Sequence, residues 1–162
     1  FFDEDNRLIG AQGRALRESK VRYVTVKVHE NSKKVFGLER WTNKEPTYLV
    51  EGPIDSLFLP NSLAMAGADM SDLSFLNKIN TTIIFDNEPR NDHISKRMID
   101  ALEKGWRIVV WQDQGNKWDS RAPKDINDMV ISGRTTDEIL KIINKNTYSG
   151  QRGKWEVTYW KV

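Results

Sequence analysis

The chain has 162 residues, of which 38% are hydrophobic and 30% charged, and it contains six tryptophans. This composition excludes a disordered polar chain and is typical of a globular protein with one substantial core. There is no apolar run long enough to span a bilayer, no signal-peptide pattern and no cysteine, which excludes disulfides and thiolate zinc sites and fits a reducing cytoplasm. The net charge of +2 is nearly balanced, so affinity for nucleic acid depends on where the charges lie.

The chain begins at Phe1 without an initiator Met, which predicts a piece of a longer protein. Two strands are predicted near this end, over Leu8–Arg14 and over 21–28. In the second strand we expect Val21, Tyr23 and Thr25 on one face, and Arg22 and Lys27 on the more polar surface.

Basic side chains are concentrated between Arg14 and Arg40, where eight of them face only three glutamates. A charge run of this kind is more often a solvated face than a binding site. The alternative is a lobe that contacts a phosphate backbone. The candidate contacts are Arg14, Arg22 and Lys27.

A polar connector at 43–46 leads into the segment on which the rest of the chain depends. Tyr48–Val50 is predicted to be a buried strand, Gly52 a tight turn, and Pro53–Leu59 a helix with proline in its first turn. Glu51 then lies at the carboxyl end of a strand, where open α/β sheets bind their ligands.

Acidic side chains follow two further predicted strands. Thr81–Phe85 is followed by Asp86 and Glu88, and Ile108–Trp111 is followed by a polar loop that ends in Asp125 and Asn127. Because parallel strands end at the same edge of a sheet, these groups are expected to lie near Glu51. Carboxylates in this arrangement suit a hard divalent cation such as Mg²⁺. Each acidic cluster alone is more often turn or cap chemistry.

The remaining elements are predicted from periodicity and capping residues. They are a short strand and turn at Ser62–Gly67, a helix carrying Leu73, Leu76 and Ile79, and further helices at Asn91–Lys104, Ile126–Ile131 and Thr136–Asn144. The tail from Tyr148 to Val162 has no helix signal, and we expect a strand or a segment that docks elsewhere.

Four motifs in this order resemble the Toprim domain, which is shared by bacterial-type primases, type IA and II topoisomerases and some nucleases. They are Val50-Glu51-Gly52-Pro53-Ile54-Asp55, Ala66-Gly67, Phe85-Asp86-Asn87-Glu88 and Lys124-Asp125-Ile126-Asn127. The stretch from Leu8 to Leu38 resembles the lobe that precedes Toprim in bacterial and phage replicative primases. The resemblance implies an α/β fold with a mostly parallel sheet flanked by helices. It also implies a basic mixed α/β lobe at 1–46, a Toprim domain at 47–133 and a C-terminal helix and tail at 134–162.

The resemblance also assigns roles by position. Glu51, Asp86 and Glu88 are the catalytic, metal-binding acids, and Asp125 and Asn127 fall where primases have a further acidic pair. Arg14, Arg22 and Tyr23 fall in the stretch linked to template or nucleotide contact, to which the basic pattern adds Lys27. Gly52, Asp55 and Gly67 are expected to shape the site without binding metal directly. Glu88 and Asn127 depart from the usual Asp, which weakens or repositions a second metal.

The predicted function is therefore a DNA primase core that copies single-stranded DNA into short RNA from ribonucleoside triphosphates, with Mg²⁺ or Mn²⁺. A hexameric replicative helicase is the expected partner, through parts absent from this sequence, and no membrane is involved. The expected location is the cytoplasm of a bacterial or phage-infected cell, at the replisome. A Toprim nuclease and a Toprim module that binds nucleic acid without catalysis are the alternatives.

Overall fold

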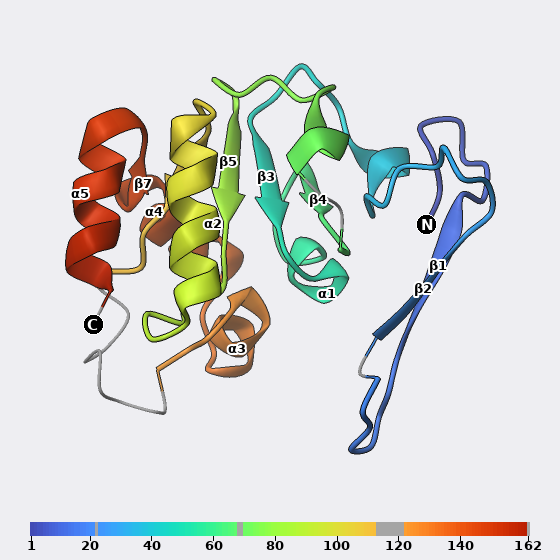
Figure 1. Ribbon diagram of the computed structural model, residues 1–162, viewed down its shortest axis with the longest axis horizontal. Helices are drawn as coiled ribbons and strands as arrows, with labels where there is room; N and C mark the ends of the chain where they lie inside the picture. Colours follow the sequence, from blue (N-terminus) through green and yellow to red (C-terminus); the bar gives the residue numbers. More distant parts are fainter. Residues whose placement is uncertain (22, 68–69, 113–121, 162) are drawn as a thin grey trace.

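The computed structural model describes residues 1–21, 23–67, 70–112 and 122–161, and it contains two sheets. The larger sheet has five strands in the order β4-β3-β5-β6-β7 (Figure 1). Its strands are β3 (Thr47–Val50), β4 (Ser62–Ala64), β5 (Thr81–Ile84), β6 (Arg107–Val109) and β7 (Thr147–Tyr148). All neighbouring pairs are parallel except β6 and β7. The mostly parallel α/β sheet expected from the sequence is confirmed.

Helices cover both faces of this sheet. They are α1 (Pro53–Ser56), α2 (Asp92–Glu103), α3 (Ile126–Ile131), α4 (Thr136–Lys145) and α5 (Gly150–Trp160), with short 3₁₀ turns η1 (Leu38–Arg40) and η2 (Met70–Leu73). Figure 1 shows α2 and α5 side by side on one face, with α4 behind the sheet. Strands β3 and β5 are buried on both faces, which explains their continuous apolar or β-branched composition. Among the described residues, no helix combines the length and apolar character needed to cross a membrane.

Two predicted helices differ from the observed ones. Helix α1 ends at Ser56, short of the predicted Leu59. The helix expected through Leu73, Leu76 and Ile79 is only the 3₁₀ turn η2 followed by turns. The side chain of Asn77 accepts a hydrogen bond from the backbone N–H of Ile79 (2.9 Å), and this local bond competes with helix.

The C-terminal tail is a helix, contrary to the prediction of a strand or docking segment. Residues 150–160 form α5, which packs against α2, and Val157 and Trp160 are part of the main hydrophobic core. Its glycines and β-branched or aromatic residues have low helix propensity, so tertiary packing determines the structure here.

Gly153 allows α5 to approach α2 closely. A Cβ at this position would lie 2.5 Å from Cδ2 of Leu102, which is itself buried. We expect Gly153→Ala to reduce the free energy of unfolding by about 1–3 kcal/mol through overpacking. In an uncrowded helix the same change would instead increase stability by about 0.5–1 kcal/mol. Thermal unfolding measures the effect, with exposed Gln151→Ala as the control. A higher melting temperature for Gly153→Ala would contradict this packing.

The small second sheet is an antiparallel ribbon of β1 (Gly10–Arg14) and β2 (Tyr23–Lys27). Figure 1 shows it beside the main sheet, with its turn reaching past the end at which β3 and β5 finish. The amide of Gln12 donates hydrogen bonds to the Thr25 hydroxyl (3.0 Å) and to the Ala66 carbonyl (3.2 Å), and so ties the ribbon to the sheet.

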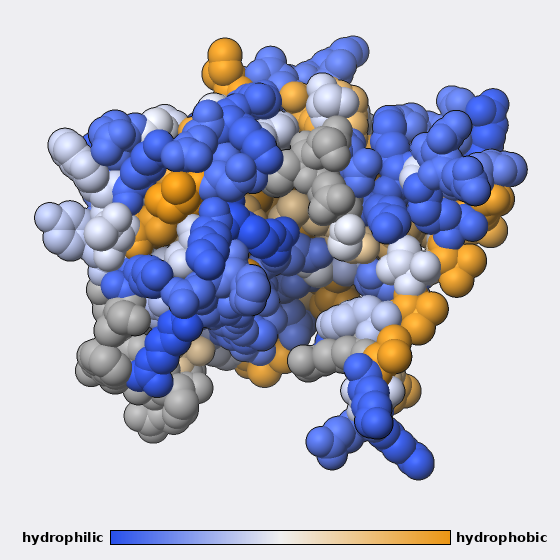
Figure 2. All heavy atoms as spheres, viewed as in Figure 1, coloured by the Kyte–Doolittle hydropathy of each residue, from blue (hydrophilic) through white to orange (hydrophobic). Residues whose placement is uncertain are grey.

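The predicted faces of β2 were partly wrong. Because strand residues alternate, Lys27 lies on the same face as Tyr23 and Thr25. The outer face instead carries Val24 and Val26, which are 55% and 60% exposed. Figure 2 shows the resulting hydrophobic rim over this part of the molecule.

Candidate metal and nucleotide site

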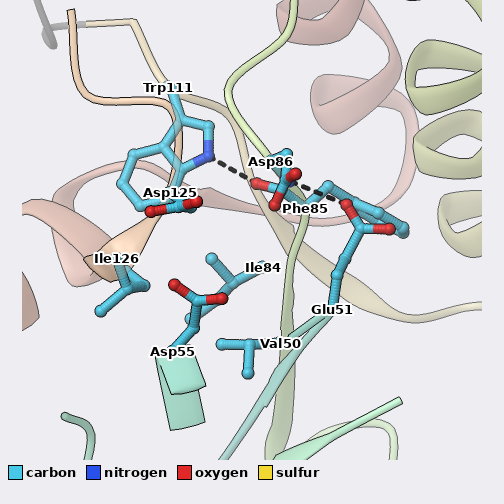
Figure 3. Close-up of a pocket in the computed structure, with 9 residues that line it drawn as sticks. All are labelled: Val50, Glu51, Asp55, Ile84, Phe85, Asp86, Trp111, Asp125 and Ile126. Carbon is cyan, nitrogen blue, oxygen red and sulfur yellow. Dashed lines mark hydrogen bonds between the residues drawn. The ribbon is translucent and has the colours of Figure 1, made fainter. Parts of the chain in front are cut away.

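Acidic side chains gather at the carboxyl end of the main sheet, as the strand pattern predicts. A small pocket there is lined by Glu51, Asp55, Asp86 and Asp125, together with apolar residues (Figure 3). The apolar lining consists of Val50, Ile84, Phe85, Trp111 and Ile126. Four carboxyl groups therefore lie together against an apolar wall.

Glu51 lies directly after β3 and is fixed through both carboxylate oxygens. Its Oε2 accepts a hydrogen bond from the backbone N–H of Asp86 (3.0 Å), which joins the ends of β3 and β5 (Figure 3). Its Oε1 forms an ion pair with Arg97 on α2. The Arg97 guanidinium lies 5.2 Å from the ring centre of Phe85, and its Nη2 is 3.7 Å from the sulfur of Met65. Packing therefore holds Arg97 in place, and Arg97 positions Glu51.

Asp86 has the most perturbed carboxylate of the group. Burial raises its pKa to about 7, the negative charge of Glu51 adds to the rise, and Lys124 partly offsets it. Burial is therefore the main reason that this carboxylate is costly to ionise. A divalent cation bound here would favour the ionised form.

Glu88 points to basic and amide groups. Its Oε1 accepts from Nζ of Lys124 (2.6 Å), and its Oε2 accepts from the Asn91 amide (2.6 Å). The hydrogen bond from Lys124 lowers the pKa of Glu88. Lys124 also lies 3.7 Å from Oδ2 of Asp86, so it bridges the two acids.

Asp55 is engaged in local structure, which fits its expected shaping role. Its Oδ1 accepts from the backbone N–H of Asn127 (2.9 Å), and this bond joins α1 to the start of α3. A Cβ on Gly52 would lie 2.6 Å from Oδ2 of Asp55, so a larger residue here would have to displace this carboxylate. Burial raises the pKa of Asp55 to about 6 despite the bond from Asn127.

Asp125 caps α3, where its side chain accepts from the backbone N–H of Asp128 (2.8 Å). It also lines the pocket, whereas Asn127 does not. Gly67, the third predicted shaping residue, follows β4 with a φ of 89°, a conformation that favours glycine.

Asn87, which lies between Asp86 and Glu88, connects three segments. Its backbone N–H donates to the Lys124 carbonyl (2.6 Å) and its amide donates to the Pro123 carbonyl (3.2 Å). Its amide oxygen accepts from the indole N–H of Trp160 (3.2 Å). The C-terminal helix α5 therefore supports the acidic loops through Asn87. The sequence pattern did not identify Asn87 as part of the site.

The predicted basic contacts lie on the ribbon, outside this pocket. Arg14 pairs with Tyr23 across the strands, and its guanidinium is 5.6 Å from the ring centre of Tyr23. Nζ of Lys27 donates to the backbone carbonyl of Glu30. Arg22 lies outside the described residues.

The ligand chemistry fits a hard cation, although its coordination is not preformed. Oxygen donors from Glu51 and Asp86 line one pocket, with Glu88 two residues along the chain from Asp86. Within the described parts of the chain, no three His, Asp or Glu side chains are grouped as a ready metal-ion site. Glu51 and Glu88 instead form ion pairs with Arg97 and Lys124.

Comparison with known proteins relates the chain to DNA primases. No protein-family model matches it. It is 33% identical over 160 residues to the DNA primase of Enterobacteria phage T4, covering 97% of this chain and 45% of that protein. The chain thus spans less than half the length of this relative.

Two solved structures share its architecture. The Aquifex aeolicus primase, solved with its zinc-binding and RNA polymerase domains, has a TM-score of 0.63 and 26% identity. The match covers 91% of this chain and 39% of the Aquifex aeolicus primase chain. The match to the DnaG catalytic core has a TM-score of 0.61 and 17% identity, and it covers 89% of this chain and 50% of that chain. At this identity the match supports the fold alone.

Proposed function

We propose that this chain is the RNA-polymerase core of a DNA primase, of the Toprim type, in a bacterial or phage replication system. The observation that carries the proposal is the pocket shared by Glu51 and Asp86 at the end of two parallel strands, in a chain whose relatives are primases. Single-stranded DNA is the proposed template, and ribonucleoside triphosphates are the proposed substrates. A replicative helicase is the proposed partner, in the cytoplasm.

Glu51, Asp86 and Glu88 are the proposed ligands of Mg²⁺ or Mn²⁺, with Asp125 and Asn127 at a weaker second position. When bound, the ion supplies charge neutralisation for the triphosphate and activates the 3′-hydroxyl for attack on the α-phosphate. The protein's own residues position the ligands. Arg97 orients Glu51, and the backbone N–H of Asp86 fixes the second oxygen of the same carboxylate.

A product assay tests the function. The full-length protein that contains this chain is incubated with single-stranded DNA, labelled ribonucleotides and Mg²⁺ or Mn²⁺, and the products are resolved by length. We expect a ladder of short RNA that requires both metal and ribonucleotides. Cleavage of the DNA without any ribonucleotide requirement would indicate a nuclease. Binding to DNA without either reaction would indicate a non-catalytic module.

The basic ribbon is the proposed contact for the phosphate backbone of the template. If Arg14 and Lys27 each contact one phosphate, Arg14→Gln and Lys27→Gln should weaken DNA binding for all sequences. Each change should reduce the slope of log K against log salt by about 0.7, the value for one lost contact to a single strand. Fluorescence anisotropy over a salt series measures this slope.

Arg152→Gln on α5 is the matched control, because α5 lies at the opposite end of the sheet from the ribbon (Figure 1). The control should leave the slope unchanged. If the slope is also unchanged in both ribbon variants, the basic residues are a solvated face and the template contact lies elsewhere.

A further inference from the structure

The backbone of Lys124 is held in place just before α3. Its N–H donates to Oδ2 of Asp128 (3.1 Å), and its carbonyl accepts from the N–H of Asn87 (2.6 Å). The first bond connects Lys124 to α3, and the second connects it to the acidic loop after β5. Any movement of the amine therefore comes from the four-carbon side chain.

The side chain of Lys124 is a counter-ion for two proposed metal ligands. Its Nζ lies 2.6 Å from Oε1 of Glu88 and 3.7 Å from Oδ2 of Asp86, and the side chain is 47% exposed. It therefore neutralises the acids from the solvent side.

Arg97, the other cation at the site, is held differently. Its guanidinium packs on the ring of Phe85 and against the sulfur of Met65 while it pairs with Glu51. Nζ of Lys124 lies near the carboxylates of Asp86 and Glu88, and the charge of Asp125 adds to the rise that the hydrogen bond to Glu88 causes in its pKa. Arg97 thus has packing contacts besides its ion pair, although its side chain is 43% exposed and that of Lys124 is 47% exposed.

We propose that Lys124 is a displaceable counter-cation, which pairs with Asp86 and Glu88 in the metal-free protein, leaves them when a divalent cation binds, and then binds the triphosphate of the incoming nucleotide. This inference rests on the proposed function, because it takes the same acids as the metal ligands.

Electrostatics requires the first step. An ammonium group and a divalent cation on the same carboxylates repel each other strongly at a separation of a few ångströms. The exposed lysine gives way, because its long side chain reaches water and its charge is readily hydrated. Before it moves, it competes with the metal for the same oxygens, so removing its charge should strengthen metal binding.

The chemistry of the released amine determines its new partner. Lysine binds phosphate groups as a point charge, and the backbone of Lys124 keeps the released amine beside the metal ligands. In the proposed reaction the triphosphate would lie at the metal ligands, and so within reach of this amine. The phosphate backbone of DNA has the same chemistry, so the experiment must separate the two ligands.

The test is calorimetric titration of wild type and Lys124→Gln, first with Mn²⁺ alone and then, on the Mn²⁺-loaded protein, with inorganic tripolyphosphate. Mn²⁺ should bind Lys124→Gln about fivefold more tightly, the size expected for removing one exposed competing charge. Tripolyphosphate should bind the loaded variant about fivefold more weakly, and Lys124→Arg should restore wild-type values. A short single-stranded oligonucleotide without terminal phosphates should bind both proteins equally.

Lys104→Gln is the matched control, because Lys104 pairs with Asp100 on an exposed part of α2. Opposite changes in the two affinities are the diagnostic result, since loss of a merely structural ion pair would weaken both. Unchanged or weaker Mn²⁺ binding by Lys124→Gln would overturn the inference and leave the proposed function standing. The inference would also be overturned if Lys124→Gln lost affinity for the oligonucleotide and kept its affinity for tripolyphosphate. If wild type itself binds no Mn²⁺, the proposed function fails and the inference fails with it.

Discussion

The Glu51→Gln variant is expected to lose primer synthesis by at least about a hundredfold, because a carboxylate at a metal-assisted site contributes several kcal/mol of charge stabilisation. The fold should persist. Glutamine keeps a carbonyl oxygen to accept from the backbone N–H of Asp86, although it loses the ion pair with Arg97. Product yield per folded protein is the measurement, with the fold checked by circular dichroism.

Glu103→Gln is the matched control, since Glu103 pairs with Lys154 away from the pocket. It should synthesise RNA at the wild-type rate. Wild-type synthesis by a folded Glu51→Gln protein would show that this carboxylate takes no part in the reaction.

The Asp86→Asn variant should be more stable than wild type in the absence of metal. Its carboxylate is buried beside Glu51, so ionisation is costly and its pKa rises to about 7. Asparagine removes that cost, and we expect a gain of about 1–2 kcal/mol in unfolding free energy above pH 7. Urea unfolding with a metal chelator present measures it, with Asp100→Asn as the control.

The pH dependence of this gain in stability follows from the direction in which the pKa of Asp86 is shifted. Because the folded pKa lies above the unfolded value of 3.8, wild type binds more protons when folded and becomes relatively more stable as the pH falls below 7. The advantage of Asp86→Asn should therefore shrink between pH 7 and pH 4. A variant less stable than wild type at pH 8 would mean that the Asp86 carboxylate is favourably paired.

The ends of the strands could be predicted from sequence because they depend on local pattern. Apolar, β-branched runs followed directly by acids place Glu51 and Asp86 at one sheet edge, once the strands are taken as parallel. Gly52 was also recognisable as a turn, although its close approach to Asp55 required coordinates.

Features that depend on packing between distant elements could not be predicted. Helix α5 has weak intrinsic propensity and is stabilised by packing, in which Gly153 lies against Leu102 and Val157 and Trp160 join the core. Arg97 reaches Glu51 from 46 positions away, and nothing in the composition of α2 distinguishes it from the other basic residues there. Asn87 was visible within the acidic motif, but its bond to Trp160 depends on a helix that the sequence did not indicate.

Calorimetric titration of Mn²⁺ into wild type, Asp86→Asn and Glu88→Asp tests most directly whether the acidic sheet edge is the metal site. Glu88 is one methylene longer than the usual Asp, so shortening it should retain binding, whereas Asp86→Asn removes a pocket carboxylate. We expect one well-bound ion in wild type and Glu88→Asp, and at least about a tenfold loss of affinity in Asp86→Asn. Equal affinity in wild type and Asp86→Asn would show that the ion binds elsewhere and would contradict the polymerase function proposed for this chain.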